Sequence, residues 1–413
     1  MPIRIKIART AGEIDDVFHL RWHVYAQEEG YFGGVRHAPP HITDRFDAHP
    51  GCFNLIAYAG EEPIATLRLN DDTGGELPSE TYWDFSGFRE RAAAEAEAAG
   101  TPVRLASASM LAIRRPWRKR RDIFRALFKV AAALGVQHGT THVIASVNHK
   151  SSAMYRRIGF HPLAGKVWIE EIGEHIVPMA CSFADFHNWA FERLEHSEAT
   201  LTQLAANAER LLYSAGEVIF REGDPADECY LVDLGTVRIT RYSPHERRTL
   251  TLSTFGPGDL FGELALVDER PRSATATATT NVEVVVIRRQ DFRAQIERDP
   301  ARAHELLQIF AERIRRTDEL ALMLAYGSTE ERLDHALRAL YEAARPSRQG
   351  SAEGVRLVHA GPTELARTAG VDEPSARRYL ERLAGEGWCE FSEERIRFMR
   401  DPGLRSHLRP PRH

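Results

Sequence analysis

A carboxylate, a guanidinium and several small residues lie close together between residues 261 and 276. Such a set could hold a ribose cyclic phosphate, because a carboxylate accepts a ribose hydroxyl and a guanidinium holds a phosphate as a two-pronged fork. Small residues let backbone N–H groups approach the phosphate oxygens. The residues predicted to contact a cyclic nucleotide are Gly262, Glu263, Leu264, Arg272 and Ser273. An ordinary turn between two strands of a β-barrel would use similar residues.

Short strand-like runs flank this segment at the spacing of a jelly roll. They lie at residues 217–220, 228–232, 236–240, 249–252 and 282–287, and glycine-containing turns separate several of them. From about Leu211 to Leu340 the chain resembles the cyclic-nucleotide-binding half of the catabolite activator (Crp/Fnr) family of bacterial regulators. The resemblance implies that Glu263 binds the ribose and that Arg272 and Ser273 bind the phosphate.

A long helix is predicted over about residues 301–326, because apolar residues recur there at helical spacing. The apolar positions are Leu306, Phe310, Ile314, Leu320, Met323 and Leu324. In the family that the chain resembles, this helix joins two subunits, which implies a homodimer. Thr317 falls where the family contacts the adenine base across the dimer, which implies cAMP as the ligand. A core helix and a solvated threonine are the alternatives.

A second cluster of charge lies in the first half of the chain. A predicted strand at residues 108–113 leads into a basic loop at 114–121 and a helix from Asp122. Free N–H groups and the dipole at the start of a helix attract anions, and the loop adds formal positive charge. The residues predicted to bind the phosphates of an acyl donor are Arg118, Arg120 and Arg121. A solvated basic face and a patch for nucleic acid are the alternatives.

The next predicted strand, at residues 141–147, is followed by a short helix that carries Asn148 and Tyr155 and ends at Gly159 and Phe160. This stretch resembles the acyl-CoA-binding half of the GNAT acetyltransferase superfamily. The resemblance implies that Tyr155 protonates the departing thiolate; a buried core tyrosine is the alternative. The basic loop lacks two glycines usual in that superfamily, a loss shared by the autoinducer synthases and the long-chain N-acyl amino acid synthases. The implied donor is an acyl carrier protein thioester or acyl-CoA.

Three further stretches are similar to that subgroup. Residues 20–31 are similar to its N-terminal signature, in which an arginine, an aromatic residue and an acid-glycine pair line the acceptor pocket. Asp44 and Asp47 are similar to its paired aspartates, and Arg68 to an arginine that ends a strand. The resemblance implies that these three charged residues order the acceptor side and position or help to deprotonate an amine that attacks the thioester. An ordinary salt bridge in an exposed loop is the alternative. An amino acid and a lysine side chain are both compatible as acceptor.

The C-terminal region is predicted to contain two short helices, at residues 362–370 and 376–385, followed by a hairpin at 388–398. Helix, turn, helix and wing is the order in the DNA-reading half of the same regulator family, to which this region is similar. The resemblance implies DNA contacts from Ser375, Arg377, Arg378 and Arg382. Glu373 and Pro374 stand where the catabolite activator reads bases, so its target sequence does not carry over. A module that only relays the nucleotide signal is the alternative.

The 413 residues carry a formal net charge of −5, with 54 Lys and Arg against 59 Asp and Glu. Any affinity for nucleic acid must therefore come from a local patch. The four cysteines lie far apart without a CxxC pair, which argues against a zinc site or a disulfide framework, and no metal ligands are predicted. No apolar run approaches the roughly 20 residues that span a bilayer, so a cytoplasmic protein is expected.

These observations predict an α+β multidomain protein. Expected are a GNAT-like α/β acyltransferase domain at 1–185, a helical linker at 186–210, a cyclic-nucleotide-binding β jelly roll with its dimer helix at 211–328, and a winged helix-turn-helix at 329–413. The expected function couples cAMP binding to N-acyl transfer and to DNA binding. The alternative is a cAMP-dependent transcription factor whose N-terminal domain senses acyl thioesters without turning them over.

Overall fold

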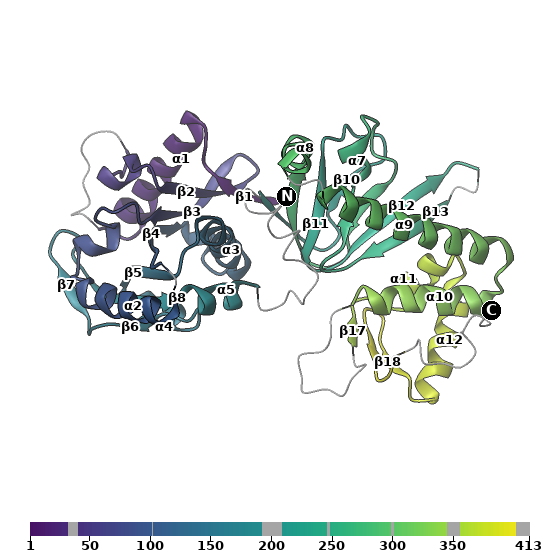
Figure 1. Cartoon of the computed structure of the whole chain (residues 1–413). Coiled ribbons are helices and arrows are strands. Elements are labelled where there is room, and N and C mark those ends of the chain that lie inside the picture. The colour runs from purple at the N-terminus through teal and green to yellow at the C-terminus, as the bar shows by residue number, and fades with distance from the viewer. Residues whose placement is uncertain are drawn as a thin grey trace. The chain divides into compact units, whose positions relative to one another are not determined.

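The protein forms two compact units, Met1–Leu211 and Leu212–His413 (Figure 1). The structure, a computed structural model, describes residues 1–31, 40–100, 102–191, 209–245, 248–298, 301–344 and 356–401. The linker predicted over residues 186–210 lies mostly outside the described residues. Within the described residues, no helix has the length and apolar character needed to cross a bilayer.

A mixed β-sheet forms the centre of the first unit (Figure 1). Its strand order is β1-β2-β3-β4-β5-β8-β6, and β7 pairs with β8. The strands are β1 (Ile3–Ile7), β2 (Cys52–Ala59), β3 (Glu62–Asp71), β4 (Leu105–Ile113), β5 (His142–Asn148), β6 (His161–Pro162), β7 (Val167–Ile169) and β8 (Glu174–Ser182). Neighbours run antiparallel except β4 and β5, which pair in parallel from Leu105–His142 to Ser107–Ile144.

Both faces of this sheet are covered. Leu55, Ile56 and Ala57 are consecutive in β2 and fully buried, and consecutive strand residues point to opposite faces. Helix α1 (Ala11–Trp22) packs Val17 against Ile56 and Tyr58, and α3 (Arg121–His138) also packs against β2 and β3. The other α-helices in the described part of this unit are α2 (Ser86–Ala99), α4 (Ser152–Arg156) and α5 (Phe183–Phe191).

Local sequence explains where α1 begins and where α3 ends. Thr10 and Glu13 form a capping box at the start of α1, which satisfies free backbone N–H groups. Helix α3 ends at Gly139, whose φ of 67° is the left-handed conformation that glycine adopts without strain. Helix α1 continues directly into a π-helix, η1 (His23–Glu28). Short π-helical turns are frequent at functional sites.

The second unit begins with the β jelly roll that the sequence predicts. One sheet has the strand order β14-β11-β16-β9, and the other has the order β10-β15-β12-β13. Fully buried residues such as Val232, Val237, Ala276 and Val284 form its core. The strands are β9 (Arg210–Tyr213), β10 (Val218–Phe220), β11 (Glu228–Leu234), β12 (Val237–Ser243), β13 (Arg248–Phe255), β14 (Leu260–Phe261), β15 (Thr275–Ala278) and β16 (Val282–Arg288).

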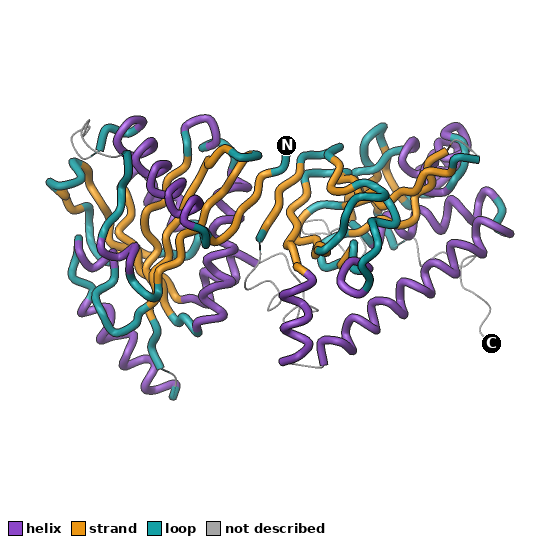
Figure 2. The backbone as a smooth tube through the Cα atoms, turned by 90° about the horizontal axis from the view of Figure 1, so that it is seen from above, coloured by secondary structure: helices purple, strands orange, loops and turns teal. Residues whose placement is uncertain are grey.

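Three helices accompany the jelly roll: α7 (Leu264–Val267), α8 (Arg289–Arg298) and the long α9 (Ala301–Tyr326), seen lengthwise in Figure 2. The bounds of α9 are those predicted from the apolar spacing. Several of its apolar side chains are more than half exposed, namely Leu307, Ile314, Leu322 and Tyr326. The described residues therefore leave an apolar face of α9 uncovered.

The chain ends in a small helical module with a three-stranded sheet of order β17-β19-β18. Its elements are α10 (Thr329–Glu342), β17 (Arg356–Val358), α11 (Pro362–Ala369), α12 (Glu373–Gly385), β18 (Cys389–Phe391) and β19 (Ile396–Phe398). Leu337, Leu365, Leu380 and Ile396 belong to its shared core. Helix α12 begins at Glu373, because Asp372 caps it and Pro374 fits its first turn.

Candidate functional sites

Gly262 shapes the turn between β14 and α7, where the cyclic nucleotide is predicted to bind. Its φ of 71° is in the left-handed region, which favours glycine. A Cβ atom added there would lie 2.8 Å from Nη1 of Arg272. Both the backbone conformation and the close guanidinium therefore require a residue without a side chain.

Arg272 is buried without a carboxylate partner among the described residues. Its side chain is 7% exposed, and Nη1 donates to the carbonyl oxygens of Glu228 and Gly262 at 2.7 and 3.2 Å. The guanidinium lies over the rings of Phe220 and Tyr230, with Cζ 4.2 and 5.4 Å from their centroids. Its Nε has no hydrogen-bond partner in the described part of the chain. Because buried charges are normally paired, this arrangement suits an anionic ligand.

Glu263 connects the same turn to α9. The residue is 4% exposed, and Oε1 lies 3.5 Å from Nη1 of Arg313. Arg313 also donates from Nη2 to the carbonyl of Leu260 at 2.7 Å and lies over the ring of Phe255. Nothing in the helical spacing of the sequence distinguishes Arg313 from other solvated arginines. Its contacts give the predicted ribose ligand a direct link to the long helix.

The other predicted nucleotide ligands are exposed. Leu264 and Ser273 flank the buried pair, and Leu264 is 46% exposed. Thr317 lies one turn beyond Arg313 on α9, where its hydroxyl donates to the Arg313 carbonyl at 2.8 Å. The structure thus gathers Gly262, Glu263 and Arg272 into one site, and it leaves Thr317 on the surface.

A network of ion pairs connects the 3₁₀-helix η3 (Arg45–Ala48) to β3 in the first unit. The Arg68 side chain is 1% exposed and donates from its two Nη atoms to the two Asp44 oxygens at 2.6 and 2.9 Å. Its Nη1 also lies 3.1 Å from Oδ2 of Asp47. The two aspartates form a capping box that starts η3. The structure therefore brings together the three acceptor-side residues that the sequence predicts.

Arg21, the arginine of the predicted N-terminal signature, and Asn54, which the sequence prediction lacks, complete this network. Arg21 of α1 is fully buried and donates from Nη1 to both Asp47 oxygens at 2.9 and 3.0 Å. Its Nη2 donates to Oδ1 of Asn54 at 2.5 Å. Arg21 lies within the signature at residues 20–31, but no sequence pattern pairs it with an aspartate 26 positions away. Asn54 has no distinguishing signal at all.

The charges of this network keep Asp47 ionised. Burial favours the neutral acid, but the guanidinium groups of Arg21 and Arg68 outweigh burial and hold the pKa of Asp47 below its ordinary value. A carboxylate held in this way is a poor proton acceptor, so Asp47 can orient its partners but is unsuited to act as a base. The side chain of Asp44 is 33% exposed and is the carboxylate of the pair that a ligand can reach.

The backbone of β4 is strained beside Arg68. The β3–β4 register shifts between Thr66 and Arg68, and the extra residue in β4 marks a β-bulge. Met110, inside this bulge, has a φ of 53° and is the only non-glycine residue with positive φ in the described ranges. Ser109, next to it, accepts a hydrogen bond from Arg68 Nε at 3.0 Å. Backbone strain of this kind is concentrated at functional sites.

Tyr25 of η1 contacts the bulge and interacts electrostatically with the charged network. Its hydroxyl donates to the carbonyl of Leu111 at 2.9 Å. Burial raises the pKa of Tyr25, and the positive charges of Arg21 and Arg68 oppose that rise. Tyr25 therefore belongs to the same site, although the sequence analysis includes it only as part of the signature at residues 20–31.

Tyr155 of α4 is buried in an aromatic cluster. It is 5% exposed and packs edge-on against Phe128 and Phe160, with ring centroids 5.8 and 5.3 Å away. Burial raises the pKa of Tyr155, and Tyr25 adds to the rise. The phenol therefore keeps its proton at neutral pH, as a donor to a thiolate must.

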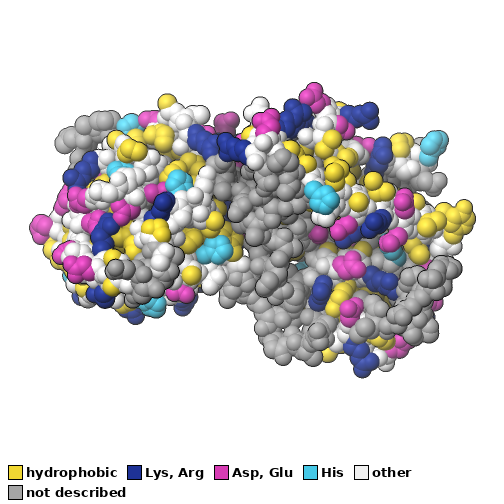
Figure 3. All heavy atoms as spheres, in the orientation of Figure 1, with side chains coloured by type: hydrophobic (Ala, Val, Ile, Leu, Met, Phe, Trp, Pro, Cys, Tyr) yellow, Lys and Arg dark blue, Asp and Glu magenta, His cyan; other side chains and the backbone are white. Residues whose placement is uncertain are grey.

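The basic loop before α3 is partly neutralised by carboxylates. Arg118 pairs with Glu28 at 2.6 Å, and Arg120 pairs with Asp122 at 2.6 Å. Arg121, the first residue of α3, is exposed and has no ion pair with a described residue. Figure 3 shows basic and acidic side chains interspersed over the visible face of this unit. Of the three predicted phosphate ligands, Arg121 is thus the one available without breaking an ion pair.

Most of the arginines on α12 also form ion pairs with carboxylates. Arg377 pairs with two carboxylates at 2.7 and 3.0 Å, and Arg382 pairs with Glu330 at 2.5 Å. Arg378 is exposed and donates to Oγ of Ser375 at 3.0 Å, with no ion pair to a described residue. Positive charge on this helix is therefore concentrated at Arg378.

Two family models match the chain. The family model of the cyclic nucleotide-binding domain matches residues 210–299, which include the buried Glu263 and Arg272. The family model of the N-acyl amino acid synthase FeeM matches residues 16–182, which include the Asp44, Asp47 and Arg68 network. The two halves of the chain therefore carry two different domains.

Curated relatives match the second half of the chain. It is 38% identical over 180 residues to a cyclic AMP receptor protein of Thermus thermophilus, covering 43% of this chain and 78% of the relative. It is 31% identical over 187 residues to a CRP-like cAMP-activated global transcriptional regulator of Mycobacterium tuberculosis, covering 45% and 81%. The solved structure of FixK2 from Bradyrhizobium japonicum is 21% identical, with a TM-score of 0.43, over 50% of this chain and 99% of that structure.

Proposed function

The chain belongs to the Crp family of cyclic AMP receptor proteins, and from this we propose that cAMP binding controls an attached N-acyltransferase domain and a DNA-binding winged helix. The proposed domains are a GNAT-like acyltransferase at 1–185, a linker at 186–210, a nucleotide-binding domain with a dimer helix at 211–328, and a winged helix-turn-helix at 329–413. The parallel start of β4 and β5 supports the first assignment, and the order α11, α12, β18 and β19 supports the last.

The unpaired buried Arg272 supports a cyclic phosphate as the ligand of the jelly roll. A phosphate would supply the negative charge that no described carboxylate gives to Arg272, and it would accept a hydrogen bond from Arg272 Nε. Glu263 would accept the ribose hydroxyl, and its contact with Arg313 would carry the bound state to α9. The names of both curated relatives, which refer to cAMP, favour adenine as the base.

The exposed apolar face of α9 supports a homodimer. Leu307 and Ile314 are seven residues apart, the repeat that keeps apolar side chains on one seam of a coiled coil. Both side chains are more than 60% exposed in the single chain. A second copy of α9 would remove this apolar surface from water and place Thr317 near the partner.

The buried network of Asp44, Asp47 and Arg68 is the observation that carries the acyltransferase proposal. Arg68 and Asp47 fix Asp44, whose side chain is 33% exposed and would hold the ammonium form of the acceptor until it loses one proton to water. The neutral amine would then attack the thioester carbonyl, forming a C–N bond as the C–S bond breaks. The departing thiolate would take the phenolic proton of Tyr155, and the amide nitrogen would return its surplus proton to the phenolate. Orientation of this kind can contribute about 7–11 kcal/mol of the barrier.

The start of α3 supports binding of the donor phosphates. Arg120 at its N-cap makes no side-chain capping bond, which leaves helical N–H groups for a ligand, and Arg121 adds charge. Arg118 would join them by exchanging Glu28 for a phosphate. An acyl carrier protein thioester or acyl-CoA would present such a phosphate.

The test is mass spectrometry of products after incubation of the full chain with acyl carrier protein thioesters or acyl-CoA and a mixture of amines, with and without cAMP. The expected result is an N-acyl product whose yield changes with cAMP. Asp44→Asn should lower the rate by about 100-fold, the cost of misplacing a reactant. Asp72→Asn is the matched control, because Asp72 also pairs with an arginine, Arg89, outside the proposed site.

A cAMP-dependent transcription factor with a non-catalytic N-terminal sensor is the second candidate. The complete set α11, α12, β18 and β19 favours it, since a pure enzyme needs no such module. If no product forms with any donor while cAMP increases retention of the protein on DNA, the catalytic proposal is wrong and this candidate replaces it. Unchanged product yield with and without cAMP would instead refute the coupling alone.

A further inference from the structure

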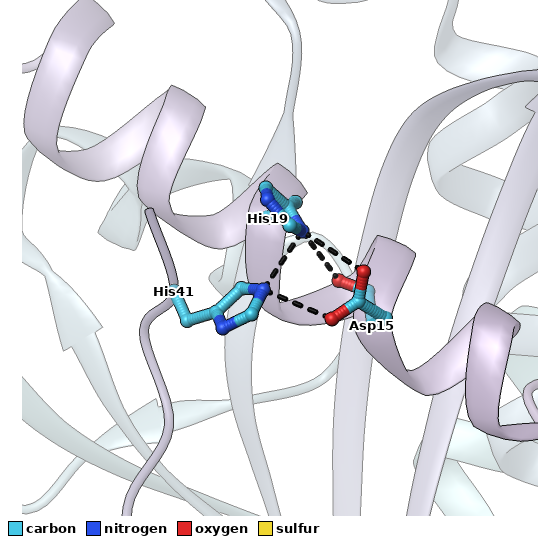
Figure 4. A group of neighbouring side chains, drawn as sticks. All are labelled: Asp15, His19 and His41. Atoms are coloured by element: carbon cyan, nitrogen blue, oxygen red, sulfur yellow. Dashed lines mark hydrogen bonds and ion pairs between the residues drawn. The ribbon is translucent and has the colours of Figure 1, made fainter. Parts of the chain in front are cut away.

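Three side chains of the first unit direct ligand atoms toward one point, as Figure 4 shows for Asp15, His19 and His41. Nε2 of His41 lies 2.8 Å from Nδ1 of His19 and 3.0 Å from Oδ1 of Asp15. Nδ1 of His19 lies 3.3 Å from Oδ2 of Asp15. Asp15 and His19 are one turn apart on α1, and His41 comes from the segment that precedes η3. The three side chains are 55%, 43% and 27% exposed, so solvent and ions reach them.

Protons alone fit this cluster poorly. If each imidazole nitrogen carried a hydrogen to donate to Asp15, two N–H groups would face each other across 2.8 Å. If one nitrogen lacked its hydrogen, it would present a lone pair to the acceptor-only carboxylate. A cation removes both conflicts, because it accepts electron pairs from all three atoms at once.

The distances match a tetrahedral zinc site with an open fourth position. Zinc bonds of 2.0–2.1 Å at tetrahedral angles place neighbouring ligand atoms about 3.3 Å apart. The two imidazole nitrogens lie 2.8 Å apart, and those of His41 and His19 lie 3.0 and 3.3 Å from Oδ1 and Oδ2 of Asp15, so the carboxylate faces both imidazoles at or slightly below that spacing. Two imidazoles and one carboxylate are also a ligand set that suits Zn²⁺.

We propose that Asp15, His19 and His41 bind one Zn²⁺ ion, which fastens the segment before η3 to α1. That segment already contacts α1, since the N–H of Ile42 donates to the carbonyl of Phe18 at 3.1 Å. Asp44 follows His41 by three residues and belongs to the network described above. The ion therefore acts as a positioning element for the acceptor-side carboxylates, apart from the nucleotide and DNA sites.

The experiment titrates the untagged, chelator-treated full chain with Co²⁺ and then displaces it with Zn²⁺. One equivalent of Co²⁺ should give the intense visible bands of tetrahedral coordination, and Zn²⁺ should abolish them. His19→Ala and His41→Ala should each lose the bands. His161→Ala, which removes another exposed histidine of the same unit, should keep them. Asp15→Asn should weaken metal binding by at least about 10- to 100-fold, because loss of an outer-shell partner alone has that effect.

Two further measurements separate metal binding from misfolding and from adventitious surface binding. Circular dichroism should show the same folded content in all four variants, because the three ligands are partly exposed. Zn²⁺ should also slow amide hydrogen exchange in residues 40–48 of the wild type and not in His41→Ala. Absence of tetrahedral bands in the wild type, or bands that persist in both histidine variants, would overturn the proposal and leave the cluster an Asp–His ion pair only.

Discussion

Arg272→Lys tests the nucleotide pocket, because it keeps the positive charge and removes the fork. A guanidinium donates two parallel hydrogen bonds to a phosphate, whereas an ammonium on the lysine stem supplies a single point of contact. In the structure Nη1 of Arg272 donates hydrogen bonds to two backbone carbonyls, while Nε has no hydrogen-bond partner in the described ranges. The variant therefore loses about one charge-assisted hydrogen bond to the ligand.

The expected loss follows from the worth of that bond. A hydrogen bond to a charged group contributes about 1.5–3 kcal/mol, which corresponds to a cAMP Kd about 10- to 150-fold higher. Isothermal titration calorimetry of the full chain with cAMP measures it. Arg289→Lys is the matched control, because Arg289 also donates to three backbone carbonyls of the same domain but lies outside the predicted ligand set.

Two outcomes would refute this reasoning. A Kd for Arg272→Lys equal to that of the wild type would show that the phosphate does not use the fork. An equal loss of affinity in Arg289→Lys would show that general loosening of the domain is responsible. Thermal unfolding without nucleotide shows whether both variants are folded before the comparison is made.

Asp47→Asn should lower the free energy of unfolding by about 3–5 kcal/mol in urea titrations, because it leaves the buried Arg21 without a carboxylate and removes one of the two carboxylates at Arg68; an unchanged value would contradict the buried network. The stability that Asp47 contributes through its lowered pKa should be fully present above about pH 4, its ordinary range, and be lost as pH falls through the lower folded-state pKa. Thermal melts should show this acid-dependent loss in the wild type and a smaller one in Asp47→Asn. Ile314→Asp should convert a dimer into monomers in analytical ultracentrifugation, whereas Glu312→Asp, on the same helix, should not; two monomeric or two dimeric variants would exclude the proposed seam. Arg378→Ala should weaken DNA binding in fluorescence anisotropy and reduce the salt slope by about 1, as expected for one phosphate contact. A larger effect from Arg382→Ala would show that its ion pair opens on DNA.

The nucleotide pocket could be predicted because its chemistry is local. Gly262, Glu263 and Arg272 lie in one short connection between strands, where the chain itself holds them near each other. The alternation of apolar residues and glycine turns likewise marks the jelly roll, and the capping residues Asp372 and Pro374 place the start of α12. In each of these cases a few neighbouring residues set the backbone conformation.

The acceptor-side network could be predicted only in part. A capping box holds Asp44 and Asp47 together, so their proximity follows from their spacing of three residues along the chain. Arg21 and Asn54 join them from α1 and β2, and no local pattern reports that packing. The bulge at Met110 escaped prediction for a similar reason, since the strain arises from the pairing of β4 with β3.

The sequence by itself determined the two domain types of this protein and pointed to a candidate site in each: Glu263 and Arg272 in the jelly roll, and paired aspartates with an arginine before a basic loop. Spacing along the chain suffices where the backbone between the groups is short and its turns are fixed by glycine and capping residues. Only the tertiary structure decided that Arg313 lies beside Glu263 and that carboxylates pair with Arg118 and Arg377. It also decided that His41 lies in a cluster with Asp15 and His19. Those contacts join separate elements, and their geometry depends on how buried apolar faces pack, which no short stretch of sequence specifies.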